Sequence, residues 1–277
     1  MSTIEWAEAG IDWLSCTVKL DADKVNEWRL RCTWAIEGIA REGHAVIPRT
    51  MNGYVGASSG NCFIGERPDG YFFNLTGEYA NRYFEHTYHP DAHYSRIDAQ
   101  ITAKYKVPQP DIGKDAYYAA SDHNNRIPPA RRRKLYIIIG SDGGDTFYLG
   151  APSSEQRGRM YNKEVQSQNE RYRGCWRWEV VFKNDLGTKF ATVLASKPSG
   201  TAGYVLGVVA KWYADRGVII PGMYDMGAVV LPKQRAVATD VERKLLWVER
   251  QVAPTVKYLL ELGFRDTLLE LLGLAEK

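Results

Sequence analysis

The 277-residue sequence has few cysteines and no long apolar run. Its four cysteines, Cys16, Cys32, Cys62 and Cys175, lie far apart without C-x-x-C spacing, which argues against a structural zinc site and against a dense disulfide framework. No segment approaches the ~18–20 apolar residues of a membrane span, and the first ten residues contain acids but no apolar core. We therefore expect neither a membrane protein nor a secretory signal, and a reducing cytoplasm is the expected location.

Several enzyme motifs are also missing. There is no phosphate-binding loop of the G-x-x-x-x-G-K-[ST] type, so we expect no built-in helicase motor, and the Gly-rich SDGGDT segment indicates a turn. No G-x-S-x-G elbow supports Ser/His/Asp catalysis. Internal repeats of 20–50 residues and low-complexity tracts are absent.

The overall composition is typical of a soluble globular protein, with 44% hydrophobic and 25% charged residues. The formal net charge of +3 is too mild to demonstrate a nucleic-acid partner, and it does not oppose one.

Residue patterns predict strands through the middle of the chain and helices near its end. Apolar spacing close to 3.6 predicts a helix over 22–41, and Pro, Asp and Asn residues predict a loop over 107–130. The expected strands are 11–20, 53–59, 61–66, 70–78, 94–105, 134–140, 145–151, 158–164 and 175–183. Helical patterns return at 201–217 and 240–263.

This order predicts an α+β fold, in which a twisted antiparallel sheet carries the polar catalytic face and helices pack on the other side. We expect an α+β domain at 1–236 and a helical C-terminal segment at 237–277.

Charged residues recur at every second position in three of these strands, which places them on one face. They are Arg96 and Asp98; Arg159, Tyr161 and Lys163; and Arg177 and Glu179. Two carboxylates suit a hard cation such as Mg²⁺ or Mn²⁺. A tyrosine flanked by cations suits attack on a phosphodiester, because cations favour the phenolate. The alternative is a solvated sheet face with cross-strand ion pairs.

The ordered motifs resemble the replication initiation factor family, the rolling-circle replication initiators of small plasmids, which have relatives in filamentous phages. The resemblance extends from about residue 11 to residue 260. The matching residues are Tyr148, Gly150 and Ser154 of the Y-x-G-S-R-x-S pattern, Arg159, Tyr161 and Lys163 of R-x-Y-x-K, Arg177 and Glu179 of R-x-E, and Arg96 and Asp98 of R-[IVL]-D.

The resemblance implies a metal-dependent DNA nicking and rejoining enzyme that uses a covalent 5′-phosphotyrosine intermediate. Tyr161 would be the nucleophile, and Asp98 and Glu179 would bind Mg²⁺ or Mn²⁺. Lys163, Arg159 and Arg177 would hold the scissile phosphate, and Arg96 would be a further DNA-binding residue. It also implies the cytoplasm of a bacterial host, origin DNA that is single-stranded at the nick, and a host helicase as a partner.

Three positions depart from the family pattern. Ala151 and Pro152 replace a Ser and an Arg, and Thr102 stands where plasmid members carry a second acid. The third metal ligand therefore stays open, with Glu78 and Asn74 as candidates. The departures motivate a second hypothesis, a DNA-binding regulator that has the fold but no nicking activity.

Two further clusters each have two interpretations. The basic run Arg131, Arg132, Arg133 and Lys134 either contacts DNA phosphates or forms a solvated junction before a strand. The histidines at 86, 89 and 93 favour a polar loop over a metal site, since the H-x-H pattern of other rolling-circle nucleases is absent.

The C-terminal segment has a leucine-rich face. Packing onto the sheet, a homodimer interface and a docking surface for a helicase are the alternatives, and a third hypothesis for the whole protein is binding of a host protein through this face. The face comprises Leu245, Leu246, Val248, Val252, Leu259, Leu260, Leu268 and Leu269.

Overall fold

The structure is a computed structural model. It describes residues 4–19, 22–107, 111–141, 144–197, 201–223 and 252–271, together with the single positions 241, 244, 245 and 248. The chain divides into two compact units, Met1–Pro232 and Lys233–Lys277. The boundary expected at 236/237 lies outside the described residues and stays a prediction.

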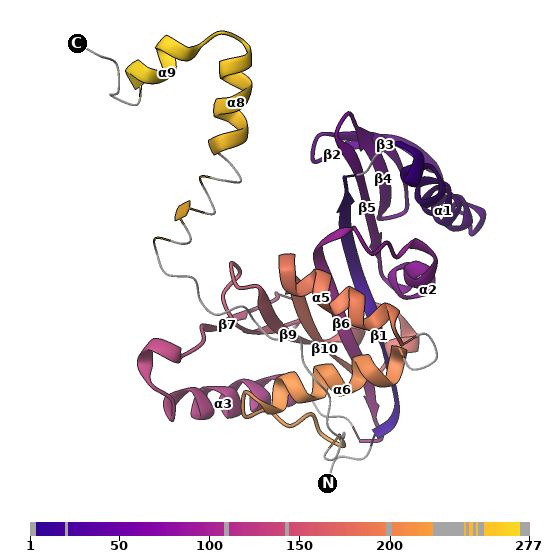
Figure 1. The fold of residues 1–277 in the computed structure, drawn as a ribbon. Helices are drawn as coiled ribbons and strands as arrows, with labels where there is room; N and C mark the ends of the chain where they lie inside the picture. The colour runs from indigo at the N-terminus through magenta and orange to yellow at the C-terminus, as the bar shows by residue number, and fades with distance from the viewer. Residues whose placement is uncertain are drawn as a thin grey trace. The chain divides into compact units, whose positions relative to one another are not determined.

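The first unit is built on a ten-stranded sheet in which every neighbouring pair is antiparallel (Figure 1). The strand order is β2-β3-β4-β5-β1-β6-β10-β9-β8-β7. The strands are β1 (Ile4–Val18), β2 (Val46–Met51), β3 (Tyr54–Ser59), β4 (Cys62–Arg67), β5 (Gly70–Thr76), β6 (His93–Tyr105), β7 (Leu135–Ile138), β8 (Thr146–Leu149), β9 (Gln156–Asn162) and β10 (Cys175–Lys183). The expected antiparallel α+β fold is confirmed.

Helices cover the sheet, and α5 and α6 cross its central strands in Figure 1. Helix α1 packs on β3 and β4, whereas α3 packs on β8 and β9. The helices of this unit are α1 (Ala22–Arg41), α2 (Glu78–Thr87), α3 (Ile112–Asn125), α4 (Lys163–Ser167), α5 (Asn184–Ala195) and α6 (Thr201–Ala214).

The two faces of the central strands differ in chemistry, as strand alternation dictates. On β6, Ile97, Ala99 and Ile101 belong to the apolar core beneath the helices. The intervening Asp98, Gln100 and Thr102 are also buried, but they lie on the opposite, polar face. The sheet therefore separates a packed apolar layer from a polar layer, and the polar layer contains the predicted site.

The helix expected at 22–41 coincides with α1, and the strand expected at 175–183 coincides with β10. The loop expected over 107–130 is wrong, because α3 occupies much of it. Its buried residues Ile112, Ala116 and Ala120 repeat every four positions and so form one helical face. The small Gly113 lets this face lie directly against the Phe147 and Trp176 rings.

In the second unit, the structure describes α8 (Ala253–Glu261) and α9 (Arg265–Leu271). Pro254 lies in the first turn of α8, where a missing N–H costs no helical bond. Of the expected leucine face, Leu268 is buried, Leu245, Val248 and Leu260 are exposed, and Leu246 lies outside the described residues. None of the helices in the described ranges is both long and apolar enough to cross a membrane.

Candidate active site

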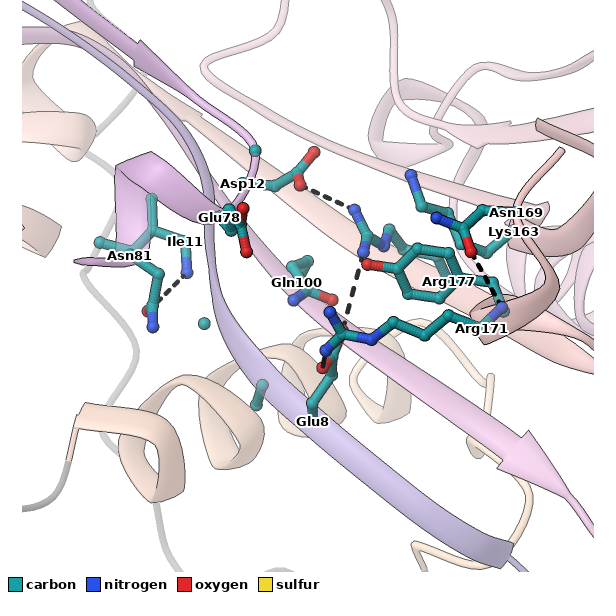
Figure 2. Close-up of a pocket in the computed structure, with 14 residues that line it drawn as sticks. Glu8, Ile11, Asp12, Glu78, Asn81, Gln100, Lys163, Asn169, Arg171 and Arg177 are labelled. Atoms are coloured by element: carbon teal, nitrogen blue, oxygen red, sulfur yellow. Dashed lines mark hydrogen bonds and ion pairs between the residues drawn. The ribbon is translucent and has the colours of Figure 1, made fainter. Parts of the chain in front are cut away.

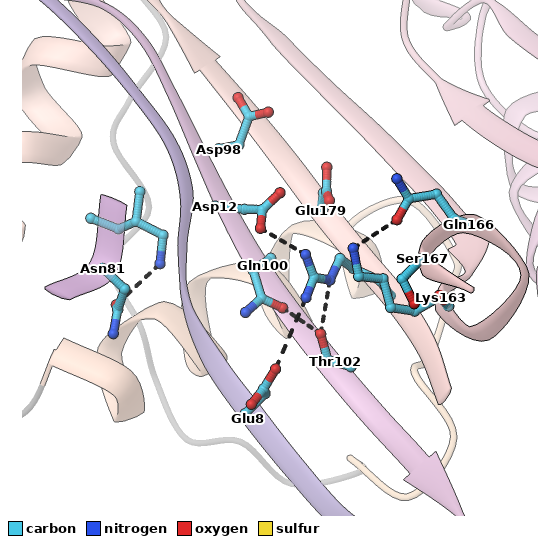
Figure 3. A network of polar contacts seen from close by, with 12 residues as sticks. Glu8, Asp12, Asn81, Asp98, Gln100, Thr102, Lys163, Gln166, Ser167 and Glu179 are labelled. Atoms are coloured by element: carbon cyan, nitrogen blue, oxygen red, sulfur yellow. Dashed lines mark hydrogen bonds and ion pairs between the residues drawn. The ribbon is translucent and has the colours of Figure 1, made fainter. Parts of the chain in front are cut away.

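Strand register places the predicted residues of β6, β10 and β9 beside one another. Glu179 of β10 lies opposite Arg159 of β9 and Gln100 of β6. Two residues along, and therefore on the same face, Arg177 lies opposite Tyr161 and Thr102. The sheet therefore brings the period-two residues from three separate strands onto one surface. Figure 3 shows Asp98, Gln100 and Thr102 of β6 beside Glu179 of β10.

The two predicted metal ligands form a buried acid pair bridged by arginine. Asp98 and Glu179 are both fully buried. The Arg159 guanidinium bonds Glu179 Oε2 through Nε and lies 3.4 Å from Asp98 Oδ2 through Nη2. Arg96 donates to both oxygens of Asp98, at 2.8 and 2.6 Å. Burial disfavours the charge on Arg159, but Glu179, Tyr161 and Asp98 outweigh burial and raise its pKa.

The predicted nucleophile lies against this pair. Tyr161 is 6% exposed, and its hydroxyl donates to Glu179 Oε1 at 2.5 Å. Burial and the Glu179 carboxylate raise the pKa of Tyr161 well above its usual value, and Arg177 and Arg159 offset this only in part. The expectation that neighbouring cations would favour the phenolate is therefore corrected: desolvation outweighs them, and the tyrosine is protonated.

A bulge in β1 adds an acid that the sequence patterns did not indicate. The β1–β6 register shifts between Ile11 and Trp13, so Asp12 has no residue opposite it. Asp12 Oδ1 accepts from Arg177 Nη1 at 2.7 Å. Arg177 Nε also donates to Thr102 Oγ1 at 2.8 Å, so Thr102 orients an arginine.

Lys163 is not on the strand with Tyr161, which corrects the expected alignment. Strand β9 ends at Asn162, whose side-chain oxygen accepts from the backbone N–H groups of Glu164 and Val165 and so caps α4. Lys163 is therefore the first helical residue, and its Nζ donates to Gln166 at 2.7 Å. This Nζ still lies 5.9 Å from the centre of the Tyr161 ring.

Two cavities have Lys163 and Asp12 in their linings. One of about 420 Å³, here the Tyr161 cavity, is lined by Tyr161, Arg159 and Tyr148. The other, of about 390 Å³, is here the Arg171 cavity (Figure 2), where Arg171 and Arg177 point toward Glu8 and Asp12. The cationic and aromatic groups around both cavities match those that proteins use to hold nucleic-acid strands.

Whether the site can hold a divalent cation depends on which oxygen atoms are free to bind it. Carboxylate oxygens are the ligands that Mg²⁺ and Mn²⁺ prefer. However, all four oxygens of Asp98 and Glu179 already contact a guanidinium or phenol donor. Within the described ranges, no group of three or more His, Cys, Asp or Glu side chains has the arrangement of a metal site. In this arrangement the acid pair does not fit an added cation, and the Mg²⁺ or Mn²⁺ site stays a prediction.

The two candidates for a third metal ligand are not part of the acid pair's contacts. Asn74 is buried on β5, where its side chain accepts from Ser15 Oγ and donates to the Asn61 carbonyl. Glu78 begins α2 and pairs with Arg82 at 3.7 Å. The sequence missed Asp12, although an acid within the apolar run IDWL was an available signal.

The remaining predicted residues lie elsewhere. The basic run 131–134 precedes β7 and is exposed. Among the histidines, His86 lies in α2 with its ring 5.6 Å from that of Trp34, and His93 is the first residue of β6. His89 lies between these elements but is buried, so the expected solvated loop is wrong for all three.

Comparison with known proteins identifies the fold. No protein-family model matches the chain, and a sequence comparison with curated proteins gives no match. Among solved structures, the chain is similar to the rolling circle replication initiator protein from Geobacillus stearothermophilus, with a TM-score of 0.54 and 18% sequence identity. The match covers 86% of this chain and 91% of the other. At this identity the similarity concerns the fold.

Proposed function

We propose that the protein is a rolling-circle replication initiator that nicks and rejoins DNA through Tyr161. The observation that carries this proposal is the Tyr161–Glu179–Arg159 contact, on a fold similar to that of a replication initiator. A phenol hydrogen-bonded to a carboxylate and flanked by guanidinium groups has a nucleophile, a proton acceptor and phosphate-binding charge in one place.

In the proposed reaction, Tyr161 Oη attacks the phosphorus of a phosphodiester while Glu179 accepts the phenol proton. The new bond joins phosphorus to the tyrosine oxygen, and the bond from phosphorus to the 3′ oxygen breaks. The 3′ oxygen takes up a proton and leaves as a hydroxyl, which primes synthesis. Reversal of these steps rejoins the strand, because the phosphotyrosine conserves the energy of the bond.

The cations of the site have the proposed role of holding the scissile phosphate. Lys163 lines both cavities, along which the strand would pass, and Arg177 lines the Arg171 cavity. Arg159 lines the Tyr161 cavity and bonds Glu179, the carboxylate that also accepts from the Tyr161 hydroxyl. Burial and the neighbouring Arg177 lower the pKa of Lys163. An anionic phosphate would relieve the repulsion between these cations, and their fixed charge would stabilise the transition state.

A second candidate function is DNA binding without nicking. It is favoured by the buried, protonated state of Tyr161 and by the saturation of the acid pair with arginine donors. A regulator needs the cationic surface but no reactive phenol.

The test is covalent adduct formation. The full-length protein is mixed with supercoiled DNA and single-stranded oligonucleotides from its own genetic element, with Mg²⁺, Mn²⁺ or EDTA, and adducts are sought by SDS gel and mass spectrometry. We expect an adduct on Tyr161, none with Tyr161→Phe, and an unchanged yield with Tyr118→Phe, a change at an exposed tyrosine of α3 outside both cavities. Binding without any adduct would favour the regulator, and loss of the adduct in EDTA would establish the metal requirement.

A further inference from the structure

A third cavity, of about 210 Å³, lies on the helix-covered side of the sheet. It is lined by His123 of α3, Arg131 and Arg133 of the basic run, Leu149 of β8, and Asp215 and Arg216 after α6. Leu149 faces away from Tyr161, because its neighbour Tyr148 lies opposite Arg159 on the polar face. The cavity is thus separated from the candidate active site by the sheet itself.

The buried residue of this cavity is a cation without a counter-ion. Arg216 is 8% exposed, and none of the described carboxylates forms an ion pair with it. Its Nε is buried with no hydrogen-bond partner, while Nη1 donates to the Trp212 carbonyl at 2.6 Å. Its guanidinium carbon lies 3.6 Å from the centre of the Trp212 ring, which fixes the plane of the group.

The charged groups around Arg216 do not supply the missing counter-ion. Burial and the nearby Arg133 lower the pKa of Arg216, and Asp215 offsets this only in part. The one acid on the cavity wall, Asp215, already pairs with Lys211 at 2.8 Å. Burying a cation is costly unless an anion accompanies it.

The basic run is held in place around this cavity. The Asn124 side chain bonds both the backbone N–H and the carbonyl of Arg133, at 2.9 and 2.8 Å. Arg132 turns instead to the carbonyls of Ile127 and Asn125. Within the described chain, the guanidinium groups of Arg131 and Arg133 have no acceptor, so both are available to a ligand.

We propose that this cavity binds a phosphate group through Arg216, Arg133 and Arg131. A water molecule needs roughly 10–15 Å³ of such space, so 210 Å³ accommodates a phosphate. The phosphate belongs either to the DNA backbone or to a free anion, and the chemistry of recognition is the same. The site goes beyond the proposed nicking reaction and does not depend on it.

The first arm of the test uses inorganic phosphate with the full-length protein. We expect the Tm to rise by about 2–4 °C in phosphate relative to chloride at matched ionic strength. Arg133→Gln and Arg216→Met should lose this rise, and the control Arg132→Gln should keep it. Because phosphate also stabilises proteins by exclusion from their surface, the difference between variants is the measurement. Arg133 is exposed, so its variant remains informative even if Arg216→Met fails to fold.

The second arm measures the salt dependence of duplex DNA binding. If the phosphate is that of DNA, Arg133→Gln should lower the slope of log K against log salt by about 0.9, and Arg132→Gln should not. Equal slopes with a positive first arm identify a free anion. The proposal is overturned if the Arg133 and Arg132 variants behave alike in both arms. Tyr161 adduct formation is scored separately, so failure of the nicking proposal leaves this result unaffected.

Discussion

The hydrogen bond from Tyr161 to Glu179 contributes to the stability of the fold as well as to the proposed chemistry. Glu179 is fully buried, and the phenol is the donor to its Oε1. We predict that Tyr161→Phe, which keeps the ring packing, lowers the free energy of unfolding by about 1–3 kcal/mol because a buried acceptor loses its donor. Urea unfolding measures this. Tyr172→Phe, whose hydroxyl has no partner in the described chain, should change the midpoint little, and an equal effect of both variants would contradict the prediction.

The pH dependence of adduct formation tests Glu179 as the proton acceptor. Burial raises the pKa of Glu179 above its usual 4.5, the Arg159 charge opposes this, and Asp12 and Asp98 add to it. A base acts when deprotonated, so the rate should rise with pH through this elevated pKa and then level off.

Glu179→Gln removes the base and provides the comparison. Because the raised pKa of Tyr161 makes phenolate scarce at neutral pH, the variant should be slow, and its rate should keep rising toward alkaline pH. Single-turnover adduct assays across pH measure both profiles. A wild-type profile identical to that of the variant would exclude Glu179 from proton transfer.

At the scale of elements, the packing of β9 on α6 positions Tyr161. A Cβ at Gly158 would lie 2.5 Å from Trp212 Cζ3 and 3.0 Å from the Tyr213 hydroxyl. We predict that Gly158→Ala costs about 1–3 kcal/mol, since a buried indole cannot move aside freely. Gly203→Ala, at an exposed position of α6 where nothing lies within 4 Å of the added Cβ, should instead add about 0.5–1 kcal/mol. Chemical denaturation of both variants, with adduct assays, makes the comparison.

Strand alternation explains which parts of the site the sequence could predict. The period of two correctly grouped Asp98, Arg159 and Glu179, because alternation holds wherever a strand is regular. It failed for Lys163, since a side-chain cap at Asn162 ends the strand one residue earlier. It could not find Asp12, because a bulge depends on the partner strand rather than on local sequence.

Other misses arise from tertiary context. Helix α3 falls in a segment with many residues that favour turns. Its small apolar face is buried only because it packs against Phe147 and Trp176, which are distant in the sequence. Arg216 is an ordinary basic residue in the sequence, and only the fold places it beneath Arg133 without a counter-ion. The sequence identified the basic run by its charge. Only the structure shows that Arg131 and Arg133 line the cavity while Arg132 bonds backbone carbonyls elsewhere.

At the scale of the whole molecule, all four cysteines are free and fully buried. Burial raises the pKa of Cys16 to about 12 and that of Cys175 to about 11, so thiolate is scarce. We predict that a thiol reagent at pH 8 labels none of them in the folded protein and all four in denaturant. Quantifying the released chromophore measures this. Rapid labelling of any one without unfolding would show local opening of its element.

The order of strands in the sheet has a consequence for how the chain acquires its structure. The adjacent strands β1, β6 and β10 come from residues 4–18, 93–105 and 175–183. During synthesis β1 can pair with β5 on one edge, but its other edge has no partner until β6 is made. The surface that joins Asp98 to Glu179 cannot assemble before β10 emerges. Such distant pairings carry a large loop-closure entropy and make folding slow. A ribosome-bound chain that stops short of residue 175 therefore lacks an assembled candidate site.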